Sequence, residues 1–408
     1  MRNHTLFVQA PVTSMPAKTE FAWYPSVDAA GADWANLSQR AQDIFFQRPY
    51  LHTVELNPPI GMRLGYLLMY KDGQPVGMAV CQIKHFSASE SLAENAETDK
   101  NPCVFTGISN WLKKRVSGWV EADILICGNL LITGAHGYWF DRELVEDHEM
   151  TDLLQRGLSY AAQQSERLGV KIAMILVKDV LPEEQATLGQ KLVKDQYTEF
   201  EIQPNMVLHL PYRDFEAYLG AMSTKYRTRA KRAFKKAEVI ERRELTSADI
   251  QQEAGKMYDL YREVATNAGF NMVDLNEHYM SALHQAMNGQ FRVFGYYLNG
   301  EMVSYCTTLL NHQELEAHFL GYNKEFNHEY QLYLNMLYDM IRVAFDSGCN
   351  KVVFARTALE IKSSVGAEPE QLLCYLCHQN GIINKFTSTV LDYLKPTEEW
   401  QQRHPFKD

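Results

Sequence analysis

Hydrophobic and polar positions alternate along two segments of the chain that share one layout. Residues 64–83 read LGYLLMY, then Lys-Asp-Gly, then PVGMAVCQI after one glutamine, and residues 291–310 read FRVFGYYL, Asn-Gly and EMVSYCTTLL. Asp-Gly and Asn-Gly favour tight hairpin turns because both central residues need a positive φ. The pattern therefore predicts a β-hairpin in each segment.

The segments that follow the two hairpins also match each other. A strand is expected at 123–133 in the first copy and at 314–322 in the second. An amphipathic helix follows each strand, at 148–168 and 330–347, and ends at a glycine before a short apolar strand. The repeated order of hairpin, strand, helix and strand predicts an α+β protein with two similar domains, each a mixed, mostly antiparallel sheet flanked by helices.

The repeat also gives the predicted domain boundaries. The N-terminal domain is expected at 1–203 and the C-terminal domain at 204–408. The first copy contains an insertion at 87–101, SASESLAENAETDKN, whose polar composition without aromatic residues predicts a mobile loop. The strand of the first copy carries no acid–base side chain at 124–130, so the active site is expected in the C-terminal domain.

Composition places the chain among soluble globular proteins. It has 408 residues, of which 46% are hydrophobic and 22% are charged. The seven cysteines are scattered and odd in number, which fits a reducing compartment better than a disulfide framework. No segment has the apolar length of a signal peptide or a spanning helix, and the histidines lack zinc-ligand spacing. A cytoplasmic protein with no metal and no permanently bound cofactor is predicted.

Positive charge is concentrated in one segment of an acidic protein. Residues 223–243 hold nine Lys or Arg and two Glu, whereas the whole chain has a net charge of −10. Such a helix is typical of a binding site for an anionic partner, and a solvated helix face is the alternative.

A second segment has the pattern of an interfacial helix. Residues 104–120 place Trp111 and Trp119 in an apolar stripe beside Lys and Arg. This pattern predicts peripheral contact with the inner membrane, with packing in a core as the alternative.

Several short motifs carry a resemblance to a known family. They are Gly128-Asn129, the Gly-Ala-His-Gly at 134–137, the Lys-Tyr-Arg-Thr-Arg at 225–229, the Gly-Tyr-Asn at 321–323, and the Ala-Arg-Thr-Ala-Leu-Glu-Ile-Lys at 355–362. With the repeated element order, the chain resembles the FemAB-like branch of the GNAT acyltransferase superfamily. Its relatives are similar to bacterial N-acyltransferases of lipids and amines and to peptidoglycan aminoacyltransferases.

The resemblance implies two tandem GNAT-like domains and transfer of an acyl group from a thioester to an amine. The donor is expected to be acyl-CoA or an acyl carrier protein, and the acceptor an amine of a lipid or lipid precursor. Typical GNAT enzymes hold the CoA pyrophosphate on a glycine-rich loop before the central helix. The corresponding residues here, 323–329, contain no glycine, which leaves a carrier-protein thioester, a long-chain acyl-CoA held differently and an aminoacyl-tRNA open as donors.

The candidate site follows from the strand, helix and loop that this fold turns toward its substrate cleft. Period-2 alternation places Glu316, His318 and Tyr322 on one face of the strand at 314–322. Amide formation needs a proton acceptor for the amine and an acid for the departing thiolate. The predicted residues are Glu316, His318 and Tyr330 for catalysis, Tyr322, Asn323, Arg356, Thr357 and Lys362 for substrate binding, and Lys225, Arg227 and Arg229 for donor binding.

Two other functions remain open at this point. The first is tRNA-dependent aminoacyl transfer to a cell-wall precursor, which the FemAB-like resemblance and the basic helix favour; nucleic-acid binding is otherwise not expected of an acidic chain. The second is a non-catalytic module that binds an acyl or glycan ligand. The predicted function is N-acyl transfer from a thioester.

Overall fold

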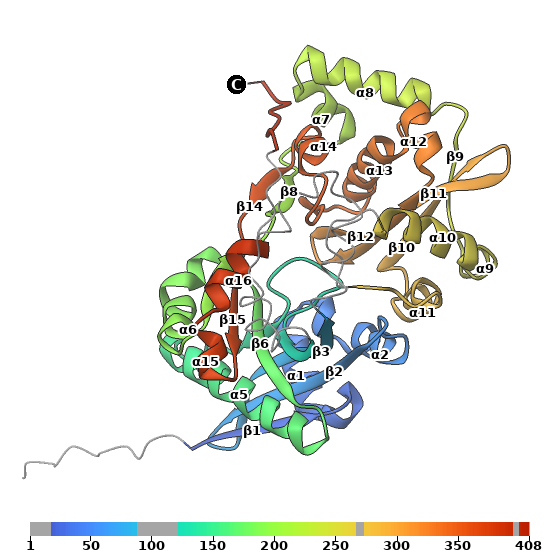
Figure 1. The fold of residues 1–408 in the computed structure, drawn as a ribbon. Helices are drawn as coiled ribbons and strands as arrows, with labels where there is room; N and C mark the ends of the chain where they lie inside the picture. The colour runs from blue at the N-terminus through green and yellow to red at the C-terminus, as the bar shows by residue number, and fades with distance from the viewer. Residues whose placement is uncertain (1–17, 88–120, 267–272, 395–399, 408) are drawn as a thin grey trace, which may run out of the picture.

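Two β-sheets with helices around them make up the protein (Figure 1). The computed structural model describes residues 18–87, 121–266, 273–394 and 400–407. The predicted mobile insertion at 87–101, after Ser87, and the interfacial segment at 104–120 lie outside this description. Among the described residues, no helix combines the length and the apolarity needed to cross a membrane.

The N-terminal half contributes the first strands and helices in chain order. They are β1 (Thr19–Tyr24), α1 (Val27–Ala41), α2 (Arg48–Leu56), β2 (Met62–Lys71), β3 (Gln74–Ser87), β4 (Glu121–Cys127), β5 (Tyr138–Phe140), α5 (Asp147–Arg167), β6 (Ile172–Val180), α6 (Gln190–Lys194) and β7 (Thr198–Glu201).

The C-terminal half begins directly after β7. Its elements are β8 (Asn205–His209), α7 (Phe215–Ala221), α8 (Thr224–Lys236), β9 (Glu241–Glu244), α9 (Ser247–Gln252), α10 (Ala254–Ala265), α11 (Tyr279–Ala286), β10 (Phe291–Leu298), β11 (Glu301–Asn311), β12 (Glu314–Tyr322), α12 (Lys324–Tyr330), α13 (Leu332–Asp346), β13 (Lys351–Val353), α14 (Leu359–Ser363) and β14 (Glu368–Glu370). The last elements are β15 (Leu373–His378), α15 (Gly381–Asn384) and α16 (Thr387–Leu394).

The two sheets have related strand orders. The first runs β1-β2-β3-β4-β6-β15-β7, with β5 on β3, and the second runs β14-β8-β13-β12-β11-β10-β9. Each has one parallel pair, β4 with β6 and β12 with β13, among antiparallel neighbours. This arrangement confirms the predicted α+β class with two mixed, mostly antiparallel sheets.

Both predicted hairpins are present, and their turns have the expected backbone. The β2–β3 turn has φ of 51° at Asp72 and 80° at Gly73, and the β10–β11 turn has 53° at Asn299 and 83° at Gly300. Successive positive φ values match the right-handed twist of the flanking strands. The local sequence therefore sets the register of each hairpin.

The C-terminal segment connects the two halves. Strand β15 lies between β6 and β7 in the first sheet, and residues 400–407 then return to the second half, where Phe406 bridges to Met222. The predicted domain at 204–408 thus supplies a strand to the N-terminal sheet.

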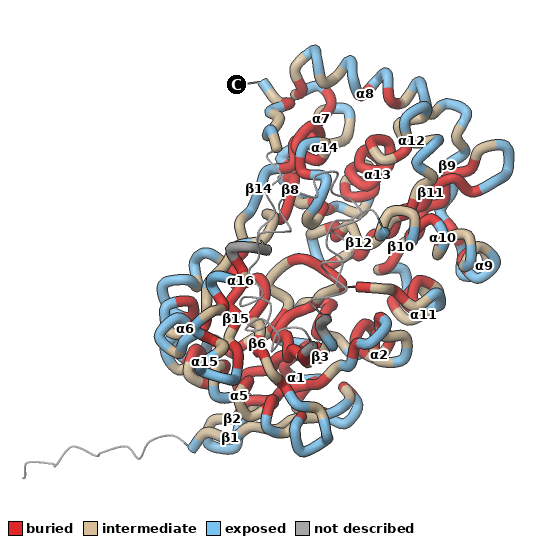
Figure 2. Tube along the Cα trace, in the orientation of Figure 1, coloured by how far each residue is buried: buried red, intermediate tan, exposed pale blue. Residues whose placement is uncertain are grey.

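A hydrophobic core is shared by the two halves. It contains Trp34 and Tyr50 from the first half and Tyr279 and Tyr305 from the second, all fully buried or nearly so. Figure 2 shows buried segments in both halves near α2 and α11, and these two helices are in contact. The halves are packed together, so side chains from both can meet at one site.

Two predicted elements end differently in the structure. The strand expected at 123–133 stops at Cys127, because Gly128 has a φ of 149° and residues 129–134 form a loop. The helix expected at 330–347 is α13 and begins at Leu332, because Gln331, whose φ is 51°, separates it from α12, which ends at Tyr330. The side-chain amide of Asn335 donates to the carbonyls of Tyr330 and Gln331 and stabilises this break.

Candidate active site

Glu316 lies where two strands of the second sheet separate. The parallel pairing of β12 with β13 joins Glu314 to Lys351 and ends with Glu316 opposite Val353. Strand β12 continues beyond this point, whereas β13 ends. In the first sheet, β4 stays paired with β6 up to its last residue, Cys127. The second sheet therefore opens at Glu316, and the side chain at this opening is a carboxyl group.

The Glu316 side chain is buried and its proton is held unusually tightly. The residue is 3% exposed. Its pKa is raised to about 8, with burial as the largest cause; His136 and Lys351 lower the pKa, and Glu314 and Asp43 raise it. A carboxyl group with a pKa near the working pH can both accept and release a proton.

Side chains of the N-terminal half meet the second sheet at β11, the strand that pairs with the Glu316 segment. The Nδ1 atom of His136 is 2.6 Å from Oδ2 of Asp43. The other carboxylate oxygen of Asp43 accepts hydrogen bonds from the backbone N–H of Phe45, at 3.0 Å, and from the side-chain amide of Asn311, at 3.2 Å. Asn311 belongs to β11, so the Asp43–His136 pair is tied to the second sheet.

The β11–β12 register explains why Glu316 faces this pair. Glu316 lies directly opposite Leu309, which packs in the core shared by the halves. Leu309 and Asn311 are two residues apart, so they lie on one face of β11. That face, with Glu316, is turned toward the N-terminal half.

Charge within the Asp43–His136 pair is mutually stabilised. Burial alone raises the pKa of Asp43, but His136 and the hydrogen bonds to the carboxylate outweigh it, so the pKa of Asp43 is lowered. Burial likewise lowers the pKa of His136, and the negative charge of Asp43 outweighs this, so the pKa of His136 is raised. Each partner of the pair therefore favours the charged form of the other.

His318 lies on the same strand but in an apolar setting. Its Nε2 atom is 2.9 Å from the hydroxyl of Tyr279, and its ring packs against Phe319 with centroids 4.5 Å apart. Among the described residues, Nδ1 has no hydrogen-bond partner. Burial lowers the pKa of His318 to about 3, so the imidazole is neutral at neutral pH.

A β-bulge changes the predicted face of the strand. Thr307 of β11 lies opposite both His318 and Phe319, and its hydroxyl bonds to the backbone N–H and C=O of Phe319. The extra residue reverses the alternation beyond it. Tyr322 therefore packs on the opposite face, with its ring 5.8 Å from that of Tyr333. The prediction that Tyr322 shares a face with Glu316 and His318 was wrong.

The predicted residues around α12 have structural contacts of their own. The Asn323 side chain caps α12 by accepting from the N–H of Glu325. Tyr330 is the last residue of α12 and precedes the break at Gln331, so it does not lie at the N-terminus of α13. The Asn327 side chain accepts the N–H of Tyr333 in the first turn of α13. The backbone N–H of Tyr333, at the start of α13, is therefore already hydrogen-bonded within the protein.

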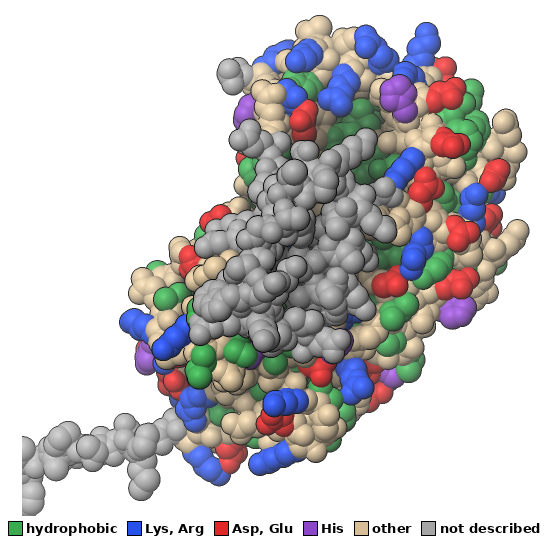
Figure 3. All heavy atoms as spheres, viewed as in Figure 1, with side chains coloured by type: hydrophobic (Ala, Val, Ile, Leu, Met, Phe, Trp, Pro, Cys, Tyr) green, Lys and Arg blue, Asp and Glu red, His purple; other side chains and the backbone are tan. Residues whose placement is uncertain are grey.

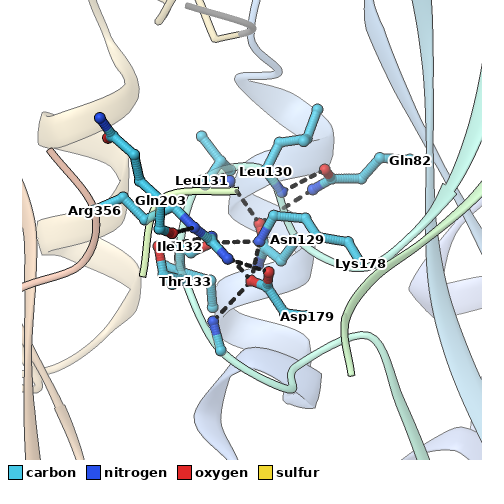
Figure 4. Close-up of polar contacts among 11 residues, drawn as sticks. Gln82, Asn129, Leu130, Leu131, Ile132, Thr133, Lys178, Asp179, Gln203 and Arg356 are labelled. Atoms are coloured by element: carbon cyan, nitrogen blue, oxygen red, sulfur yellow. Dashed lines mark hydrogen bonds and ion pairs between the residues drawn. The ribbon is translucent and has the colours of Figure 1, made fainter. Parts of the chain in front are cut away.

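Arg356 connects the loop after β13 to the first half (Figure 4). Its guanidinium forms an ion pair of 2.6 Å with Asp179, which is fully buried, and also donates to the carbonyl of Gln203. Lys178 forms a second ion pair with Asp179 and donates to the carbonyl of Ile132. This network fixes the loop after Gly128 against the loop after β13.

The loop that carries Arg356 has a strained backbone. Ala355, Thr357 and Ala358 have φ values of 58°, 68° and 48°, in a region that residues with a side chain rarely adopt. The side-chain nitrogen of Lys362 donates to the carbonyls of Ala355 and Arg356, and the residue is 4% exposed. Burial lowers the pKa of Lys362 to about 7. Thr357 is exposed at the tip.

The predicted donor-binding residues lie on α8, away from Glu316. Tyr226, Ala230, Ala233 and Phe234 pack on the core of the second half, whereas Lys225 and Arg229 are exposed and Arg227 is half-buried. Figure 3 shows Lys and Arg side chains along the molecular surface over α8. The helix packs against α12 and α13.

Sequence reasoning missed the residues from the first half. Asp43 and Asp179 bond to Asn311 and Arg356 of the second half, and each also pairs with a residue of its own half, His136 and Lys178. His136 is part of the Gly-Ala-His-Gly motif. Lys178 and Asp179 are a charged pair at the end of an apolar strand, which was an available signal. Asp43 is not part of a motif or of a charged pair in the sequence, so no sequence pattern pointed to it.

The second half matches a known family over much of its length. Residues 224–363 match the acetyltransferase (GNAT) domain. This part of the chain is a GNAT domain. It begins with α8 and contains Glu316, His318, Arg356 and Lys362. The resemblance to the GNAT superfamily is therefore confirmed for the C-terminal half, in which the active site was expected.

The fold of most of the chain is similar to that of a solved structure. FemX has 13% sequence identity and a TM-score of 0.51, over 83% of this chain and 93% of that chain. A tandem GNAT protein from the clavulanic acid biosynthesis pathway has 10% identity and a TM-score of 0.49, over 88% and 98%. No curated, functionally characterised protein matches the sequence. The fold is thus similar to that of FemX.

Proposed function

We propose that this protein is an N-acyltransferase that moves an acyl group from a thioester, acyl-CoA or an acyl carrier protein, to an amine of a lipid or lipid precursor. The observation that carries the proposal is the position of Glu316 in the GNAT domain, buried at the last paired residue before β12 and β13 separate. A thioester can reach backbone groups at such an opening.

Glu316 is the proposed proton acceptor. The acceptor amine arrives as an ammonium, gives one proton to the Glu316 carboxylate, and attacks the thioester carbonyl carbon. A C–N bond forms, the C–S bond breaks, and the second proton of the amine leaves with the thiol. A pKa of about 8 suits Glu316 to this exchange, whereas His318, with a pKa of about 3, is a weak base.

Most of the remaining predicted residues have supporting roles in this proposal. Tyr330 is the candidate acid for the departing thiolate. Arg356, Thr357 and Lys362 bound the loop after β13, where the acceptor is proposed to bind. Tyr322 and Asn323 are left out of this role, because Tyr322 packs on the opposite face from Glu316 and Asn323 caps α12. Lys225, Arg227 and Arg229 on α8 are proposed to attract the anionic donor.

The test is thiol release by the purified protein given acyl-CoA of graded chain length and a long-chain amine. Glu316→Gln should lower turnover by about 10²–10⁴-fold, while donor binding changes little because the proton moves in the transition state. His318→Ala serves as the comparison on the same strand. Full activity in Glu316→Gln, His318→Ala and the double variant would move the chemistry elsewhere, with Tyr330 and Lys362 next.

The FemX-like fold also fits aminoacyl transfer from tRNA, with α8 as the contact for the nucleic acid. Mass spectrometry of ligands that copurify with the protein distinguishes the two functions. An acyl-phosphopantetheine or a long-chain amine supports acyl transfer from a thioester, whereas tRNA supports the second function. A glycan or an acyl ligand without turnover would support a binding module.

A further inference from the structure

A His–Asp pair of the N-terminal half lies over the face of the second sheet that carries Glu316. His136 and Asp43 are 2.6 Å apart, with side chains 14% and 17% exposed. Asn311 holds Asp43 from the second sheet through its amide, and its side-chain oxygen accepts the N–H of Ile44. The pair is thus fixed by hydrogen bonds across the interface and does not depend on a surface contact.

We propose that the Asp43–His136 pair is a positioning element of the active site, which holds the imidazole of His136 beside Glu316 and thereby favours the carboxylate form of that side chain. The inference rests on the proposed function, in which Glu316 accepts the proton of the amine. It assigns a role in the chemistry to the half of the chain that lacks an acid–base group on its own matching strand.

The charges around Glu316 support a dominant role for His136. Glu314, on its own strand, and Asp43, from the first half, both disfavour the carboxylate, and Lys351, from β13, favours it. His136 is the largest favourable influence on the Glu316 carboxylate and opposes the cost of burial. Its own charge is maintained by Asp43, against burial and the nearby Lys178. Glu316 therefore depends on Asp43 indirectly, through His136.

This dependence predicts a graded response to substitution. His136→Asn keeps a side-chain donor for Asp43 but removes the positive charge, and leaves the negative charge of Asp43 facing Glu316. Asp43→Asn removes that negative charge and also lets His136 become neutral. The pKa of Glu316 should therefore rise in both variants, by about one pH unit or more in His136→Asn and by less in Asp43→Asn. The double variant should resemble Asp43→Asn.

The experiment is a titration of the whole protein labelled with ¹³C at the glutamate carboxyl carbon. The resonance absent from Glu316→Gln identifies Glu316, and its midpoint is followed by NMR in the wild type and the three variants. His85→Asn is the matched control, because His85 forms a similar pair with Asp123, at 3.1 Å, on an exposed surface. The midpoint should rise in the order given and stay unchanged in His85→Asn. An unchanged midpoint in both His136→Asn and Asp43→Asn would overturn the inference.

Turnover separates this inference from the proposed function. If the inference holds, His136→Asn should lose activity at pH 7 and recover it at higher pH, because the acidic limb of the pH profile follows Glu316. A variant that merely disturbs packing would lose activity at every pH. If Glu316→Gln retains full activity, the proposed base is wrong, while the NMR midpoints still report the electrostatic coupling on their own.

Discussion

The guanidinium of Arg356 and the carboxylate of Asp179 meet at 2.6 Å between residues 177 positions apart in the chain. Asp179 has no exposed surface, and Lys178 and the N–H of Gly134 also bind it. Burial disfavours its charge, but Lys178 and Arg356 outweigh that cost, so the pKa of Asp179 is lowered. The buried Asp179 carboxylate thus binds two cationic side chains and joins the loop of Gly134 to the loop of Arg356.

Replacing Asp179 should destabilise the whole protein. Asp179→Asn leaves Lys178 and Arg356 buried without their counter-charge, and removing one partner of a buried pair costs about 3–5 kcal/mol. The free energy of unfolding in urea measures this loss. Asp28→Asn is the control, since its pair with Arg48 is exposed and such pairs contribute about 0–1 kcal/mol. Equal effects of the two substitutions would show that the buried network adds nothing.

Lys362 should make stability depend on pH in the alkaline range. Burial lowers its folded pKa to about 7 from 10.5, so between these values the unfolded chain binds more protons than the folded protein. Stability from this group therefore rises as the pH increases from about 7 to about 10. Lys362→Met should flatten the profile of unfolding free energy over that range, and Lys231→Met on the exposed face of α8 should not. A slope unchanged in Lys362→Met would mean that the lysine is charged in the folded state.

His318 should contribute little as a base. Its imidazole is neutral and weakly basic, with a pKa of about 3, and its Nε2 atom is engaged with Tyr279. His318→Gln can keep that hydrogen bond, so kcat should fall by less than tenfold, below the ~10²–10⁴-fold expected of a general base. Steady-state kinetics beside Glu316→Gln provide the comparison. A larger loss in His318→Gln than in Glu316→Gln would assign the proton transfer to His318.

Reversing the charge of α8 should weaken donor binding. Substituting Lys225, Arg227, Arg229 and Lys231 by Glu removes the positive charge that attracts an anionic donor, and it should also flatten the salt dependence of binding. Calorimetry at low and high ionic strength measures both effects. Lys191→Glu with Lys194→Glu on α6 is the control, because that helix packs against α5 and β7 in the first half. Unchanged donor affinity at low salt would leave α8 as a solvated surface.

The sequence predicted what local rules determine. Asp72-Gly73 and Asn299-Gly300 specify their hairpins within a few residues, and the apolar periods of α5 and α13 specify which helix faces are buried. The repeat of these local signals was enough to predict two related sheets. The same repeat pointed to the strand that carries Glu316, which lies where β12 and β13 separate.

The remaining features depend on contacts between distant residues. His136 and Asp43 are 93 positions apart, and Asn311 is 268 from Asp43. The bulge at Thr307 reverses the face of Tyr322, and nothing in strict alternation along 314–322 signals it. Such relationships are set by the packing of one half on the other, which a periodicity in one segment does not encode.

The position of β15 has a consequence for how the chain is made. Strand β7 pairs with β15 alone in its sheet, and β15 also covers the edge of β6. Residues 373–378 are synthesised after the entire GNAT domain match at 224–363. On the ribosome, the N-terminal sheet therefore cannot be completed until the second half has been translated, and β6 presents an open edge throughout that interval. The half that is synthesised first is therefore completed only after the strands of the second half have been made.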